Sequence, residues 1–227
     1  MREKGNKMSP FFATISRMKY IERWALMRNS RPENLSEHAA EVAMIAHALC
    51  VIGNVRYNRG LNAERAALIG LYHDASEIIT GDMPTPVKYY NDDLKKAYKE
   101  VENAAEQRLL DKLPDDLRPS YEAIFHPLYE SDPEDMSDEA AANPMIAAAM
   151  EKLYEQDAYA RRLVKAADKL SALIKCIEES RAGNTEFRTA EESTRSAIDA
   201  LSEELPEVRD FVREFLPSYG KTLDELL

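Results

Sequence analysis

Two histidines and two aspartates in this chain, on three separate predicted helices, are together candidate ligands of a metal. His73 and Asp74 are adjacent within the apolar stretch 68–79, while His38 and Asp168 lie in two other stretches with helical apolar spacing. An aspartate is rarely buried unless it is paired or bound to a metal. Two imidazoles and two carboxylates form a mixed nitrogen and oxygen donor set, which suits Mn, Co, Fe, Zn or Ni better than Ca or Mg. We therefore predict that these four side chains hold one divalent transition metal.

Hydrolysis is the chemistry that such a centre would support. Four protein ligands leave positions for a water molecule and a phosphoryl oxygen, and a metal lowers the pKa of its bound water towards neutrality. Glu77, one helical turn after His73, is placed to orient that water or to move a proton. Arg23 stands beside the single tryptophan, Trp24, and a guanidinium next to an indole suits a phosphate together with a sugar or base. The pattern indicates metal-assisted hydrolysis of a phosphate ester.

The spacing of apolar residues predicts the helices that must position these groups. The stretch 68–79 reads as one helix, on which His73 and Glu77 share a face. This helix is expected to end near Gly81, because glycine suits a helix terminus, and Pro84 prevents it from resuming. Further helices are predicted over residues 8–28, 36–52, 92–113, 144–181 (with an interruption near Gln156), 185–204 and 206–216.

The composition predicts an all-α protein with one core. Glycine occurs only 7 times in 227 residues, and no run alternates apolar and polar side chains at the period of a strand. We expect one domain over residues 1–227, with an acidic insertion near 131–150 whose first part, 131–143, reads as a loop. The two cysteines, Cys50 and Cys176, suit a reducing cytoplasm better than a disulfide framework.

Charge and hydropathy exclude several kinds of partner. The net charge of −11 argues against binding to a nucleic acid polymer, which needs a basic surface, but not against a small phosphate ester. No stretch approaches the ~20 apolar residues that a membrane span requires. The N-terminus is charged and no apolar signal segment follows it. We therefore expect a cytoplasmic protein that acts at neither a membrane nor a nucleic acid.

The order His38, His73-Asp74, Asp168 is the signature of the HD-domain phosphohydrolase superfamily, and the likeness goes further. Five blocks of sequence closely resemble the bacterial HD-domain 5′-deoxynucleotidase, and two later segments extend the match over most of the chain. The blocks are residues 21–29, 33–38, 72–77, 80–89 and 165–168, and the later segments are 175–179 and 183–187. A bare HD pair is a weak motif, whereas five matched blocks in the right order are a strong one.

This resemblance implies a homodimeric HD-domain helical bundle that hydrolyses deoxyribonucleoside 5′-monophosphates to the deoxynucleoside and phosphate, usually with cobalt or manganese. It also implies a role for each matched residue. The implied metal ligands are His38, His73, Asp74 and Asp168, of which His38, Asp74 and Asp168 also contact substrate; the implied catalytic residues are Glu77, Arg23 and Asp82; and the implied remaining substrate contacts are Trp24, whose bulk disfavours a ribose 2′-hydroxyl, and the loop residues Met83, Pro84 and Thr85.

Two departures and three alternatives accompany this interpretation. The chain has extra residues at 1–7 and the acidic insertion near 131–150, neither of which removes a ligand. An HD enzyme acting on a dNTP, a cyclic nucleotide or an alarmone keeps the same site, although Arg23 and Trp24 favour a monophosphate. A non-catalytic nucleotide-binding regulator is disfavoured, because binding alone would not need a water-activating metal or Glu77. An all-α scaffold with incidental histidines and aspartates requires several coincidences at once.

Overall fold

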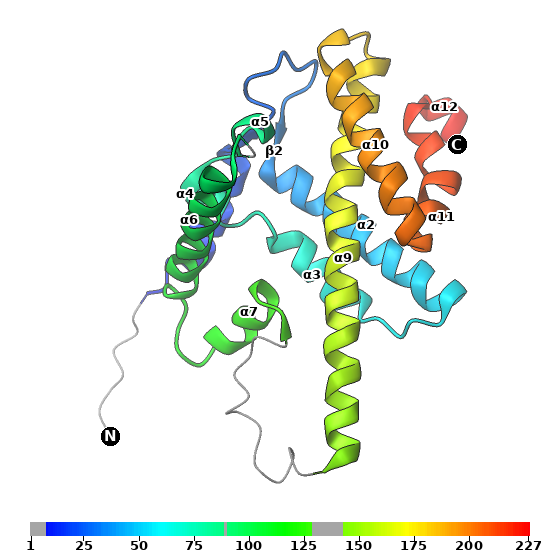
Figure 1. Ribbon diagram of the computed structural model, residues 1–227. Coiled ribbons are helices and arrows are strands. Elements are labelled where there is room, and N and C mark those ends of the chain that lie inside the picture. The colour runs from blue at the N-terminus through cyan, green and yellow to red at the C-terminus, as the bar shows by residue number, and fades with distance from the viewer. Residues whose placement is uncertain (1–7, 89, 129–142) are drawn as a thin grey trace.

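A computed structural model describes residues 8–88, 90–128 and 143–227, and this part of the chain is predominantly helical (Figure 1). Its only sheet is an antiparallel pair of two-residue strands. The all-α prediction is confirmed. The elements are α1 (Phe11–Ile15), the 3-10 helix η1 (Ser16–Tyr20), β1 (Glu22–Arg23), β2 (Glu33–Asn34), α2 (Leu35–Tyr57), α3 (Ala63–Tyr72), α4 (Glu77–Thr80), α5 (Thr85–Lys88), α6 (Asp92–Leu110), α7 (Arg118–Phe125), α9 (Pro144–Arg181), η4 (Thr185–Phe187), α10 (Arg188–Glu204), α11 (Pro206–Glu214), η5 (Leu216–Gly220) and α12 (Leu223–Leu226).

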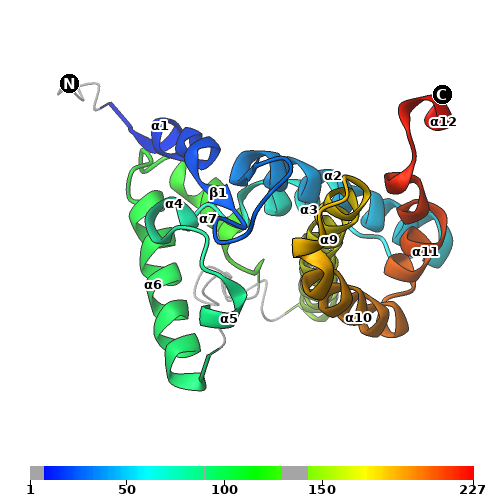
Figure 2. The ribbon, with the colours of Figure 1, turned by 90° about the horizontal axis from the view of Figure 1, so that it is seen from above.

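Helix α9 is the axis of the molecule, and α2, α3 and α10 pack along it. Viewed from above, α2 and α3 lie on one side of α9, while α10 and α11 lie around its other side (Figure 2). The main core forms between these helices, where Leu49 of α2 and Leu163, Leu170 and Leu173 of α9 are completely buried. Full burial of each such side chain contributes about 1.5–3 kcal/mol. The helices that carry His38 and Asp168 are therefore fixed against one another by the core itself.

A second, smaller apolar cluster holds the N-terminal segment and α6 beside this core. Phe11, Leu35, Ala75 and Leu109 are fully buried within it. Leu35 is the first residue of α2 and Ala75 directly follows Asp74. This cluster therefore links the start of the helix that carries His38 to the turn that carries the HD pair.

The helix predicted over residues 8–28 is wrong beyond Tyr20. The chain turns extended at Ile21, and β1 pairs with β2 so that Arg23 lies opposite Glu33. Trp24 then adopts a left-handed backbone conformation with φ of 58°. The apolar spacing that suggested a helix here reflects contacts made by a hairpin instead.

The helix predicted over 68–79 is also wrong, because it is interrupted at the HD pair. α3 ends at Tyr72 and α4 begins at Glu77, with a turn at 73–76 between them. The Ala75 N–H donates to the Tyr72 carbonyl at 3.0 Å, which closes a turn over three residues where an α-helix would bond four residues back. Aspartate and serine favour such turns because their short polar side chains compete with the helical backbone.

Helix α9 runs without the interruption predicted near Gln156, whose side-chain amide donates to the Arg59 carbonyl at 3.2 Å. Helix α2 likewise continues past its predicted end at residue 52, as far as Tyr57. The acidic loop predicted over 131–143 falls almost wholly outside the described residues, as do the extra residues 1–7.

By length and composition α2 is also apolar enough to cross a membrane, with a mean hydropathy of 1.4. The prediction that no stretch approaches this length is therefore wrong for α2. Half of its most apolar window is buried inside the protein, and the core helix of a helical protein passes the same test. We accordingly assign α2 to the core.

Candidate metal centre

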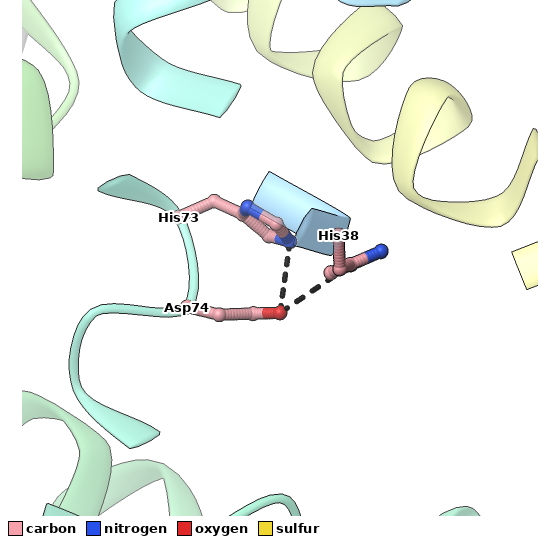
Figure 3. Close-up of side chains that lie close together, drawn as sticks. All are labelled: His38, His73 and Asp74. Atoms are coloured by element: carbon pink, nitrogen blue, oxygen red, sulfur yellow. Dashed lines mark ion pairs between the residues drawn. The ribbon is translucent and has the colours of Figure 1, made fainter. Parts of the chain in front are cut away.

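Three separate elements bring the candidate ligands together. His38 comes from the first turn of α2, His73 and Asp74 from the turn after α3, and Asp168 from the middle of α9. The Oδ2 atom of Asp74 lies 3.0 Å from His73 Nε2 and 3.5 Å from His38 Nε2. Figure 3 shows both imidazoles directed at this one carboxylate oxygen. A ligand atom from each of these three residues lies within 4.8 Å of the others, so the group could hold one ion.

Asp168 approaches this group from α9. Its Oδ1 atom lies 3.3 Å from His38 Nε2. Burial alone would raise the pKa of Asp168, but the adjacent imidazole of His38 and the charge of His73 hold that pKa well below its usual range. The structure therefore brings His73, Asp74 and Asp168 together around His38, with Asp168 outside the tightest group of three.

A relay of hydrogen bonds sets the tautomer of His38, which is completely buried. The Ser171 hydroxyl donates to Glu41 Oε2 at 2.6 Å, so its oxygen is left to accept from His38 Nδ1 at 2.9 Å. With its proton on Nδ1, His38 presents an unprotonated Nε2 to Asp74 and Asp168. This is the orientation that outer residues impose on metal-binding histidines.

His73 is oriented by the backbone of its own helix. Its Nδ1 donates to the Gly70 carbonyl at 2.7 Å, which again leaves Nε2 facing the centre. Gly70 is required there, because a Cβ atom would lie only 3.0 Å from the Ala43 Cα of α2. Among the described residues, the Nε2 atoms of both His38 and His73 are buried without a hydrogen-bond partner. Two orphaned nitrogens aimed at carboxylates are the arrangement that a divalent cation would satisfy, so the donor set fits a metal.

The two histidines differ in charge preference. Burial lowers the pKa of His38, and the nearby Arg23 lowers it further. Burial would also lower the pKa of His73, but the adjacent Asp74 raises it to about 9. The charge of Asp74 therefore favours a positive charge at His73, whereas burial and Arg23 keep His38 neutral.

Glu77 begins α4 and is only 7% exposed. Burial, together with the charges of Asp74 and Asp82, raises the pKa of Glu77 to about 9, and its Oε2 has no partner among the described residues. Sequence reasoning placed Glu77 and His73 on one helical face, which is wrong because the HD turn separates them. Glu77 nevertheless stays beside the centre and is placed to hold or release a proton there.

Arg23 and Trp24 lie on the hairpin side of the centre. The Arg23 guanidinium binds Glu33 at 2.7 Å. Burial would lower the pKa of Arg23, but the carboxylates of Glu33 and then Asp168 raise it, so this guanidinium keeps its charge next to the ligand group. Trp24 packs against Phe187 with ring centroids 5.4 Å apart, and its buried indole nitrogen has no partner within the described chain.

Asp82 supports Trp24 from across the site. Its Oδ2 accepts the Trp24 backbone N–H at 3.2 Å, which stabilises the left-handed conformation of Trp24. The chain reaches Asp82 through Gly81, whose φ of 73° ends α4 where the sequence predicted a stop. Met83 and Pro84 follow as partly exposed residues, and Thr85 begins α5, although its side chain is outside the described set.

Sequence reasoning assigned no role to Glu179, which proves to hold the hairpin in place. Glu179 is 2% exposed on α9 and accepts the Ser30 N–H at 2.7 Å and the Asn184 amide at 2.7 Å. It also pairs with Lys175, which donates to the Arg31 carbonyl at 2.5 Å. The signal that could have revealed this network is a Lys and a Glu four residues apart on an otherwise apolar helical face.

Comparison with known proteins gives a consistent family. The sequence profile of the YfbR-like 5′-deoxynucleotidases matches residues 10–219. The chain is 42% identical to a 5′-deoxynucleotidase of Shewanella oneidensis over 221 residues, covering 96% of this chain and 98% of that protein. A 5′-deoxynucleotidase of Yersinia pseudotuberculosis is also 42% identical, over 219 residues that cover 96% and 97% of the two chains.

Solved structures share the fold at lower sequence identity. An HD-domain phosphohydrolase of Listeria innocua superposes with a TM-score of 0.69 at 20% identity, covering 92% of this chain and 87% of that one. The HD phosphohydrolase of cyanophage S-2L, solved with dA and one catalytic zinc ion, gives a TM-score of 0.57 at 18% identity over 92% and 96%. With the histidine and aspartate centre in the turn after α3 and a profile match over residues 10–219, this chain belongs to the YfbR-like 5′-deoxynucleotidase family.

Proposed function

We propose that this protein hydrolyses deoxyribonucleoside 5′-monophosphates to the deoxynucleoside and inorganic phosphate. The observation that carries the proposal is the pair of buried, unpartnered Nε2 atoms of His38 and His73, which meet at Asp74 in a member of this family. A site of this kind needs a cation to complete it. A scaffold with incidental histidines would instead bury them with partners for every nitrogen.

His38, His73, Asp74 and Asp168 would hold one divalent metal, and cobalt or manganese suits their mixed donor set. When bound, the metal lowers the pKa of a water molecule and polarises the phosphoryl group. Arg23 retains its charge beside the ligands and is placed to bind the phosphate. His38, Asp74 and Asp168 line the place where that phosphate would lie.

The remaining catalytic and selective roles belong to the residues between the hairpin and α5. Glu77, whose pKa is raised to about 9 by burial and by the nearby carboxylates, is suited to move a proton during hydrolysis. Asp82 fixes the Trp24 backbone, and we assign it a catalytic role beside Glu77. The indole of Trp24, backed by Phe187, disfavours a ribose 2′-hydroxyl by its bulk. Met83, Pro84 and Thr85 complete the nucleotide pocket.

Phosphate release from dAMP and AMP, measured side by side with cobalt, manganese, magnesium or EDTA, tests this function. We expect metal-dependent release from dAMP and little from AMP, and a smaller difference between the two in Trp24→Ala. Trp24→Phe serves as the matched control, because it keeps an aromatic ring against Phe187. Release only from a dNTP or a cyclic nucleotide would contradict the monophosphate assignment. An unchanged preference in Trp24→Ala would remove Trp24 from sugar selection.

We also propose that two copies of the chain associate through the outer face of α2. The exposed residues of α2 between 40 and 55 lie on one narrow stripe and none is charged. This outer α2 stripe consists of Ala40, Met44, His47, Val51 and Val55. Met44 is 66% and Val55 78% exposed. An antiparallel copy crossing at His47 would bring Met44 opposite the partner's Val51, the self-complementarity that a two-fold dimer requires.

Charge supports a second copy over other occupants of the stripe. The chain carries a net charge of −11, so two copies repel each other except where the contacting faces are uncharged. An anionic membrane surface would instead require a basic rim. The buried, unpaired thiols of Cys50 and Cys176 fit a cytoplasmic location. We treat residues 1–227 as one HD-type domain, since α2 contributes to both apolar clusters.

A further inference from the structure

A cavity of about 720 Å³ opens from the metal centre on the side away from the hairpin. It lies between α6, α7 and α9, and His73 and Asp168 form part of its wall. Arg23, Trp24 and Asp82 are not among its lining residues. His73 and Asp168 therefore border a cavity that Arg23, Trp24 and Asp82, the residues proposed to bind the nucleotide, do not line, and we call this cavity the second side of the centre.

The cavity is lined by cations although the protein as a whole is acidic. Lys99, Arg161, Arg162 and Lys165 all contribute to its wall, in a chain with a net charge of −11. A cleft lined with one sign of charge concentrates ligands of the opposite sign. Two carboxylates also line the cavity: Asp168, one of the candidate metal ligands, and Glu106 of α6, whose pKa is raised by burial, which makes its charged form less favourable.

Three of these four cations are already engaged. Arg161 is held by Asp157 at 3.1 Å, Arg162 by Glu204 at 2.9 Å, and Lys99 lies 3.6 Å from Glu102. Lys165 is exposed and makes no hydrogen bond or ion pair with the described residues. It precedes Asp168 by three residues on α9, so the two side chains share a helical face. Its ammonium group is free to meet an anion next to the metal ligands.

The geometry of phosphate ester hydrolysis suggests a function for the cavity in the release of phosphate. The attacking and leaving oxygens lie roughly in line across the phosphorus. If the nucleoside occupies the side of Arg23 and Trp24, the new oxygen–phosphorus bond forms on the opposite side as the bond to O5′ breaks. The bound nucleoside blocks the side of Arg23 and Trp24. If phosphate is released before the nucleoside, it can therefore leave only through the cavity.

We propose that this cavity is an anion subsite that receives the inorganic phosphate released by hydrolysis, and that Lys165 binds that phosphate. The inference rests on the proposed function, because it takes the nucleoside to lie beside Arg23 and Trp24. It adds a second phosphate site and a residue to which the ligand arrangement alone gives no role.

Inorganic phosphate is the probe that tests this subsite, with and without turnover. In metal-loaded Lys165→Gln we expect the Kd for phosphate, measured by calorimetry, to weaken about tenfold, because one charge-assisted hydrogen bond is lost. The inhibition constant of phosphate against dAMP hydrolysis should rise by a similar factor, while the KM for dAMP stays close to the wild-type value. Lys165→Arg should restore phosphate binding. Lys152→Gln, which removes an exposed lysine several turns earlier on α9 and outside the cavity, should change neither constant.

Three results would overturn the inference. Unchanged phosphate affinity in Lys165→Gln would remove Lys165 from phosphate binding. An equal loss of dAMP and phosphate affinity would place Lys165 in the nucleotide site instead. If wild type bound dADP more tightly than dAMP and Lys165→Gln erased that difference, the cavity would serve a nucleotide's second phosphoryl group. Because calorimetry reads phosphate binding without turnover, the subsite stands or falls separately from the proposed deoxynucleotidase activity.

Discussion

At the scale of single residues, the centre depends on side chains that would never touch the metal. Ser171 accepts from His38 only because its own proton is committed to Glu41. Because the Ser171 hydroxyl donates to Glu41, it can only accept from His38, and His38 Nδ1 must carry the proton. A histidine whose tautomer is fixed in this way loses less entropy when it coordinates a cation.

Replacing Ser171 with alanine should weaken metal binding without unfolding the protein. The fully buried His38 would lose the acceptor that keeps its proton on Nδ1, so we expect the metal dissociation constant to rise by about 10–100-fold. Competition with a fluorescent chelator measures this constant directly. Ser202→Ala is the matched control, because within the described residues the Ser202 hydroxyl bonds only to the Ile198 carbonyl on α10. Equal metal affinity in both variants would show that the relay does not orient His38.

At the scale of elements, the hairpin that carries Arg23 and Trp24 is fastened to α9 through Glu179. One carboxylate accepts from the turn at Ser30 and Arg31 and from Asn184 beyond the end of α9. These bonds replace the regular backbone pairing that a two-residue strand cannot supply. Burial would raise the pKa of Glu179, but the Lys175 ammonium, together with the Ser30 and Asn184 donors, holds it at about 2.

Because the pKa of Glu179 is depressed, the contacts between Glu179 and the hairpin should weaken in acid. Glu179 stabilises the fold at pH values above its unfolded pKa of about 4.5, and this contribution is lost as the pH falls towards about 2. We expect Glu179→Gln to be less stable than wild type at pH 7 and to lose less of its free energy of unfolding between pH 5 and pH 3. Urea unfolding at each pH measures both effects.

Glu178→Gln is the control for this experiment, because Glu178 is the exposed neighbour of Glu179 on the same helix. Its stability curve should follow that of wild type. If Glu179→Gln also followed wild type across the acid range, the hairpin would not depend on this carboxylate.

The sequence predicted the site better than the elements that carry it. His38, His73, Asp74 and Asp168 stand out because a polar side chain in an apolar stretch is visible locally, and the structure brings them together. The left-handed Trp24 is not visible locally, because Asp82, which stabilises it, lies 58 residues away. Apolar spacing alone cannot register such a contact, and it therefore extended the first helix through the hairpin.

The HD turn was missed for a related reason. Leu68, Leu71, Ala75 and Ile78 have helical spacing on both sides of the break, so the apolar pattern continues where the hydrogen bonds do not. The break is what separates Glu77 from the helical face of His73. Ala75 is completely buried, whereas Leu68 and Leu71 are 45% and 41% exposed, so the periodic spacing does not mark one continuous buried helical face.

At the scale of the whole molecule, the uncharged outer α2 stripe predicts a dimer that a single charge disrupts. Val51, 39% exposed at the middle of the stripe, should meet its partner copy near Met44. Val51→Glu would bury a carboxylate in that contact, so we expect the mass measured by light scattering to fall from that of a dimer to that of a monomer.

Val101→Glu provides the matched control for this prediction, since Val101 is 51% exposed on α6, far along the chain from the stripe. It should keep the wild-type mass. A monomeric wild type, or a dimer that survives Val51→Glu, would place the interface elsewhere or remove it.

Because α9 is one continuous helix, the spacing of its residues fixes the direction in which each functional side chain points. Lys165, Asp168, Ser171, Lys175 and Glu179 recur at intervals of three or four residues, so one face of one helix carries the cavity, the metal centre, the relay and the fastening of the hairpin. One residue inserted between any two of them would turn the later ones by about 100° and separate functions that are now in register. The acidic insertion that the sequence predicts near residues 131–150 would precede all five, where added length would change no phase.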